Sequence, residues 1–78
     1  MTNLQKYENA FTGTLSVSNT ELTDLTYQGV ANWDSVGHMA LVAAIEEAFD
    51  IMMDTDDIID FSSFEKGKEI MRKYDVEL

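Results

Sequence analysis

The chain has no cysteine, no proline and only five basic residues among 78. Without cysteine it can form no disulfide bond, and it offers neither a thiolate metal ligand nor a thiol nucleophile of its own. It has no apolar run near the roughly 18 residues of a membrane span, and its amino terminus lacks the charged-then-apolar pattern of a signal peptide. These absences predict a soluble protein of the cytoplasm.

Acidic residues number fifteen against five basic ones, and the net charge of -10 is spread along the chain rather than confined to a tail. Nucleic acid is itself negatively charged and would be repelled. The composition therefore favours partners with basic protein surfaces and argues against nucleic-acid binding.

The length predicts one small domain, residues 1–78, and we expect a monomer. A chain this short buries only about 60–65% of its unfolded surface, which leaves little volume for a large internal active site. We therefore expect no catalytic residues and no enzymatic activity of the chain by itself.

Apolar residues at helical spacing predict four helices and no strand. The first begins near Thr2 and ends near Gly13, the second runs from Ser35 to Phe49, the third is a short helix after Asp54, and the last opens with a capping box of Ser62 and Glu65. Residues 15–32 are rich in serine, threonine, asparagine and glycine and predict a long loop, with one helical turn near residues 20–25. The predicted fold class is a small all-α four-helix bundle with a long first connection and a short third helix.

The pair Asp34-Ser35 directly precedes about four turns of apolar-periodic sequence, so Ser35 is predicted to lie exposed where the loop becomes helix. The first N–H groups of a helix have no intrahelical acceptor, and the helix dipole adds positive character. A phosphate esterified to Ser35 would gain about 0.3–1 kcal/mol there. The same pair is also a common helix start, so by itself it indicates only a cap.

The segment from Trp33 to Phe49, continuing through Ile51, Met53, Asp56, Ile58 and Phe61, resembles the acyl carrier protein family. In that family an Asp-Ser-Leu motif opens the second helix and its serine receives 4'-phosphopantetheine. The resemblance covers about residues 30–71, and weakly the first helix. It implies a bundle of acyl-carrier type with a covalent 4'-phosphopantetheine on Ser35, whose thiol would hold an acyl or aminoacyl group as a thioester.

The resemblance also implies partners and their contact residues. A phosphopantetheinyl transferase would modify Ser35, and loading ligases, acyltransferases or synthases with basic docking surfaces would follow. The pathway would be fatty-acid, polyketide, cell-envelope or related biosynthesis. Partner recognition would fall to Asp34, Val36, Met39, Glu46 and Glu47.

Two further roles follow from the same resemblance. Asp34 would help to position the magnesium ion of the transferase reaction, so the chain needs no metal of its own. A cleft that shelters cargo would be lined by Leu41, Ile45, Ile58 and Phe61, although plain core packing also accounts for these side chains.

Three positions depart from the housekeeping pattern. Val36, Gly37 and Ala40 stand where fatty-acid carriers usually have a leucine and two acidic residues. Glycine at this place resembles the D-alanyl carrier protein, which keeps an aminoacyl cargo open. Glycine in a first turn costs up to about 1 kcal/mol relative to alanine, so Gly37 either lets an enzyme approach the serine closely or is simply tolerated.

Other readings of the same stretch are weaker. Asp34, Ser35 and His38 suggest a serine hydrolase, but the sequence supplies no oxyanion hole, no substrate pocket and no second histidine, so we interpret His38 as a surface residue of the docking face. Trp33 is expected to seal the loop with its indole N–H in water. An acidic helical adaptor that binds a basic protein without modification remains the alternative function.

Residues 54–60 superficially suggest a calcium loop. An EF-hand needs an oxygen ligand at the fifth position and a glycine at the sixth, where this chain has Ile58 and Ile59. We therefore expect no calcium site there.

Overall fold

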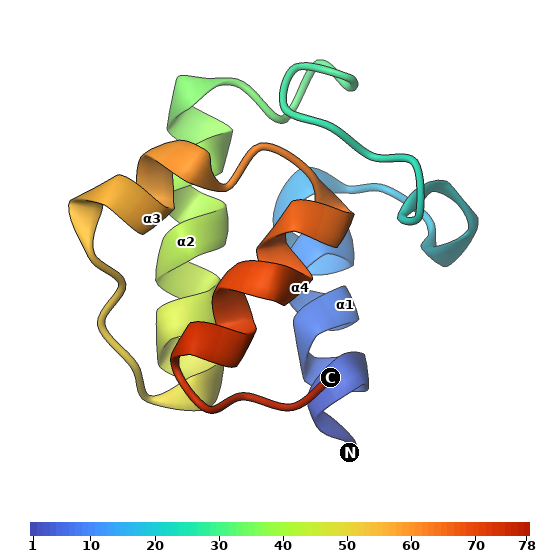
Figure 1. Cartoon of the computed structure of the whole chain (residues 1–78). Helices are drawn as coiled ribbons and strands as arrows, with labels where there is room; N and C mark the ends of the chain where they lie inside the picture. Colours follow the sequence, from blue (N-terminus) through green and yellow to red (C-terminus); the bar gives the residue numbers. More distant parts are fainter.

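The computed structural model describes all residues from Met1 to Leu78 and is built from helices joined by loops, with no β-strand (Figure 1). The elements are α1 (Asn3–Leu15), the short 3₁₀ helix η1 (Asn19–Glu21), α2 (Ser35–Phe49), α3 (Thr55–Asp60) and α4 (Phe64–Lys73). The prediction of a small all-α fold is confirmed. None of the helices combines the length and the apolar character needed to cross a bilayer.

Helix α1 begins as the sequence predicts and ends later. Thr2 caps it through a box in which its hydroxyl accepts from the Gln5 N–H while the Gln5 side chain accepts from the Thr2 N–H. The predicted end near Gly13 is wrong, because Gly13 keeps a negative φ and the helix runs on to Leu15. Ser16 then adopts the left-handed conformation, with φ of 58°, that commonly ends a helix.

The core is formed by α1, α2, α4 and the loops that flank α2 and α3, and it includes an aromatic cluster. The ring centroid of Phe11 lies 5.6 Å from that of Trp33 and 5.1 Å from that of Phe64, both in edge-on geometry. Such pairs add about 0.5–1.5 kcal/mol each beyond the area they bury. Tyr7 joins the cluster and donates its hydroxyl to the Phe64 carbonyl at 2.7 Å, and burial raises the pKa of that hydroxyl.

The long loop between α1 and α2 is held to the helices at both ends. The Asn32 side chain donates to the Leu15 carbonyl at 2.9 Å and so satisfies a backbone group at the end of α1. Residues 20–25, predicted as a helical turn, contain only the end of η1. The loop buries Val17, Leu22, Leu25 and Trp33.

An isolated antiparallel bridge between Thr26 and Ser63 ties the loop to the start of α4. The Tyr27 N–H donates to the Ser62 carbonyl at 2.8 Å, and the Phe64 N–H donates to the Leu25 carbonyl at 2.9 Å. The predicted cap of the last helix is therefore wrong by one residue. Ser63, the bridge residue, caps α4 by accepting from the Lys66 N–H at 2.9 Å, whereas Ser62 contributes its carbonyl to the contact with Tyr27.

Helix α3 lies across the amino-terminal half of α2, as Figure 1 shows in orange over green. Asp56 and Asp57 occupy its first turn, where the helix dipole favours negative charge. Ile59 is 72% exposed. Its side chain lines a hollow beside Ser35.

Gly67 of α4 provides the first test of this packing. A Cβ atom there would overlap the Tyr7 hydroxyl and the Phe61 ring, both of which are buried. We expect Gly67→Ala to destabilise the protein by about 1–3 kcal/mol, the usual cost of overpacking a core. Urea unfolding followed by circular dichroism measures the change in the free energy of unfolding.

Gly13→Ala is the matched control. Gly13 lies in α1 with no neighbouring atom within 4 Å of an added Cβ, so alanine should stabilise the helix by up to about 1 kcal/mol. Equal effects of the two substitutions would contradict the packing described for α4.

Candidate functional site

Ser35 is the first residue of α2, and its side chain is exposed. Asp34 precedes it as the cap, with its Oδ1 accepting from the Gly37 N–H at 2.8 Å. The Ser35 hydroxyl and the backbone N–H groups of Ser35 and Val36 make no hydrogen bond within the protein. The site therefore combines an accessible hydroxyl with two unpartnered N–H donors at the positive end of a helix.

Gly37 has a structural role that the sequence did not indicate. A Cβ atom there would overlap the backbone carbonyl of Asn32, which lies against the first turn of α2. Asn32 is also the residue that caps the end of α1 through its side chain. The glycine thus lets the loop pass close to α2 immediately before Ser35.

A hollow of about 380 Å³ opens beside Ser35, between α2, α3 and the loop. Its lining is mostly apolar and consists of Tyr27, Ser35, His38, Met39, Ile58, Ile59, Phe61 and Ser62. Of the four residues that the resemblance assigned to a cargo cleft, Ile58 and Phe61 line this hollow. The other two, Leu41 and Ile45, are fully buried in the core and do not reach it.

His38 is not a docking-surface residue but a partly buried link between three segments. The Trp33 Nε1–H donates to His38 Nδ1 at 2.9 Å, and His38 Nε2 lies 2.8 Å from the Ile58 carbonyl. Because an indole N–H can only donate, Nδ1 is the acceptor and Nε2 carries the proton that the carbonyl accepts. The two rings lie nearly parallel, at 17°.

The prediction for Trp33 is accordingly wrong in one respect. The residue does seal the loop against the helices, but its side chain is completely buried and its N–H bonds to His38 rather than to water. The five-residue separation of the two side chains spans the loop and the first turn of α2, so helical periodicity could not have paired them.

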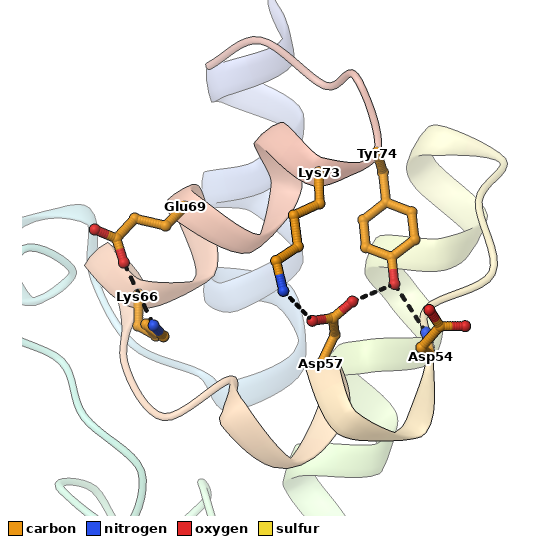
Figure 2. Close-up of polar contacts among 6 residues, drawn as sticks. All are labelled: Asp54, Asp57, Lys66, Glu69, Lys73 and Tyr74. Carbon is orange, nitrogen blue, oxygen red and sulfur yellow. Dashed lines mark hydrogen bonds and ion pairs between the residues drawn. The ribbon is translucent and has the colours of Figure 1, made fainter.

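A second contact holds α3, on its other side (Figure 2). The Asp57 carboxylate accepts from Lys73 Nζ at 2.8 Å and from the Tyr74 hydroxyl at 2.6 Å. The Tyr74 oxygen in turn accepts from the Asp54 N–H at 2.8 Å. Asp57 is the only buried charged residue, and its partners lie 16 and 17 positions away, where helical periodicity could not have paired them.

The pKa values of this cluster shift in the directions that its contacts require. Hydrogen bonds from Lys73 and from Tyr74 lower the pKa of Asp57. The bond to Asp57 raises the pKa of Lys73 and also that of Tyr74. The ionised carboxylate is therefore the form that the folded protein favours.

The residues that the resemblance assigned to partner recognition differ in exposure. Val36 is 77% exposed and Met39 56% exposed, and both flank Ser35 on α2. Asp34 and Glu47 are also exposed. Glu46 is partly buried, and its Oε2 accepts from the Met53 N–H at 2.8 Å, which fixes the link between α2 and α3.

Basic residues are confined to the two ends of the chain. No lysine or arginine occurs between Lys6 and Lys66, so the ionisable side chains of α2 and α3 are all acidic except His38. The three ion pairs all draw their cations from α4: Lys66 with Glu69, Lys68 with Glu65, and Lys73 with Asp57. Apart from Asp57, the acidic residues of α2 and α3 have no cationic partner within the protein.

No group of three or more histidine or acidic side chains comes together in a way that could hold a metal ion. The comparisons with known proteins return no match to a protein-family model, a curated protein or a solved structure.

Acid should weaken the Asp57 contacts in a predictable way. Because the folded state lowers the pKa of Asp57, its contribution to stability is fully present above the unfolded pKa and is lost as the pH falls through the folded value. We expect wild type to be more stable than Asp57→Asn at neutral pH. The difference should shrink below the ordinary aspartate pKa of about 3.9. Urea unfolding across this pH range measures it.

Asp56→Asn serves as the control on the same helix, since Asp56 is exposed and makes no side-chain hydrogen bond. Its stability difference from wild type should be smaller at neutral pH. A difference in the free energy of unfolding between wild type and Asp57→Asn that does not change with pH would show that the carboxylate charge does not contribute to stability.

Proposed function

We propose that this chain is a carrier protein of the acyl-carrier type, with Ser35 as the attachment site of 4'-phosphopantetheine. The observation that carries the proposal is the position of Ser35: exposed, without a hydrogen-bond partner, first in α2, and on the wall of a mainly apolar hollow. The bound group would supply a thiol that holds an acyl or aminoacyl group as a thioester. The chain itself has no cysteine to do so.

The surroundings of Ser35 suit a phosphodiester. Two unpartnered N–H groups, those of Ser35 and Val36, are available to negatively charged oxygens, and the helix dipole contributes about 0.3–1 kcal/mol at such a position. During modification the Ser35 oxygen would bond to the phosphorus atom of coenzyme A that bears the pantetheine arm. The diphosphate P–O bond would break, adenosine 3',5'-bisphosphate would leave, and the hydroxyl proton would pass to the transferase. Asp34 keeps one carboxylate oxygen free of the cap for a magnesium ion in that complex.

The surface next to Ser35 suits partner enzymes. Val36 and Met39 form a small exposed apolar patch, and Asp34 and Glu47 supply negative charge around it. Apolar contact with a charged rim is typical of transient protein interfaces. A phosphopantetheinyl transferase and the loading and unloading enzymes of a biosynthetic pathway would dock here through basic surfaces.

The geometry of His38 argues against a serine hydrolase. A general base must accept the proton of the nucleophile within hydrogen-bond distance. Both nitrogens of His38 are already engaged, one by the indole of Trp33 and the other by the carbonyl of Ile58. Carrier function needs no such base in the chain, because the partners perform the chemistry.

Transfer of phosphopantetheine from coenzyme A tests the proposal. With a broad-specificity phosphopantetheinyl transferase, intact-mass spectrometry of wild type should show the gain of one phosphopantetheine group. Ser35→Ala should show none, because it lacks the accepting oxygen.

Ser62→Ala is the matched control, since Ser62 is an exposed serine on the same hollow. It should gain the group as wild type does. Failure of folded wild type to be modified by several transferases would overturn the proposal and favour the unmodified acidic adaptor.

A further inference from the structure

We infer that His38 closes the passage between α2 and α3, so that the cargo of this carrier is a short acyl or aminoacyl group held in the surface hollow. A long chain would have no route into the core. This inference rests on the proposed function, because it concerns the group that Ser35 would carry.

The first argument is the position of the imidazole. His38 belongs to the wall of the hollow, and it also bonds across the α2–α3 interface to the Ile58 carbonyl at 2.8 Å. Its ring centroid lies 5.4 Å from that of Tyr27 and 6.1 Å from that of Phe61, both of which line the hollow. A chain that passed from the hollow toward the core between α2 and α3 would have to displace this ring.

Displacement of the ring is costly because it has a second partner. The Trp33 side chain is completely buried, and its only acceptor is His38 Nδ1. Moving the imidazole aside would leave the indole N–H buried without an acceptor, which is one of the more expensive defects in a protein interior. The imidazole ring that blocks the passage is therefore held in place from the core side as well.

The core behind the His38 ring is already filled with side chains. Leu41, Ile45 and Trp33 have no exposed surface, and Phe61 has almost none. Every hollow of the structure opens to solvent, and none is enclosed in the core. Close-packed interiors do not admit extra methylene groups without displacement of side chains or backbone.

Helix α3 cannot easily swing outward to make room. Consecutive residues of this helix are tied to different neighbours: Asp57 to Lys73 and Tyr74 near the end of α4 (Figure 2), and Ile58 to His38 on α2. Widening the passage would break both sets of contacts together.

The hollow itself suits a small group. Its volume of about 380 Å³ is at the lower end of the range for small-molecule sites, about 300–1,000 Å³. The hydroxyls of Tyr27 and Ser62 on its wall make no hydrogen bond within the protein and are available to a polar atom of the cargo. A short acyl or aminoacyl thioester matches this combination of apolar wall and free hydroxyls.

A chain-length series tests the inference. Wild type is loaded at Ser35 by a phosphopantetheinyl transferase from acetyl-, butyryl-, octanoyl- and dodecanoyl-coenzyme A, and cleavage of each thioester by hydroxylamine is followed by intact mass. We expect cleavage rates within about twofold of one another. A dodecanoyl thioester cleaved more than about tenfold slower than the acetyl one would overturn the inference, because a buried thioester reacts only through its exposed fraction.

His38→Ala tests the role of the side chain. Removing the imidazole should open the passage and vacate the space of the ring, so that part of an octanoyl or dodecanoyl chain enters there, which slows cleavage of the thioester and raises the unfolding temperature in this variant alone. His38→Gln keeps an acceptor for Trp33 and a donor for Ile58 and should behave as wild type. Cleavage rates that do not change with chain length in folded His38→Ala would overturn the inference that His38 closes the passage.

Failure of a variant to fold and failure of wild type to be loaded have different meanings. Should His38→Ala fail to fold, the chain-length series on wild type still decides the inference, because slow cleavage of the dodecanoyl thioester there would overturn it. Should wild type accept no acyl-phosphopantetheine at all, the proposed function fails. Protection of long chains on a loaded protein overturns only the inference about His38.

Discussion

The region around Ser35 depends on one chain of hydrogen bonds, from the indole N–H of Trp33 through the His38 ring to the Ile58 carbonyl. The indole is completely buried, and a buried donor without an acceptor costs about 1–3 kcal/mol. His38 supplies the acceptor and uses its second nitrogen to hold α3. One side chain thereby joins the long loop, α2 and α3 into the frame on which the hollow beside Ser35 is built.

Much of the framework could be predicted from local pattern. Tyr7, Phe11 and Leu15 follow helical spacing, and all three are buried on α1. The change from a loop rich in serine, threonine and asparagine to an apolar-periodic run put Ser35 at the start of α2. These features could be read because helix formation and capping depend on residues within about four positions of each other.

The details that shape the hollow could not be predicted in the same way. Trp33 pairs with His38, Asp57 with Lys73 and Tyr74, and Glu46 with the Met53 N–H, and each pairing depends on how separate segments pack. Ser62 resembles a helix cap in the sequence, but its carbonyl accepts a hydrogen bond from the Tyr27 N–H beside the bridge with the loop. Local propensity yields to tertiary contacts at such positions.

The absence of basic residues between Lys6 and Lys66 has a practical consequence for anyone studying this protein. Trypsin cleaves after lysine and arginine, so it leaves residues 7–66 as a single fragment with Ser35 near its middle. A group attached to Ser35 would sit on a peptide far longer than those that routine digests identify. Surveys of tryptic peptides would then overlook the modified form, even in cells where every copy of the protein carried it.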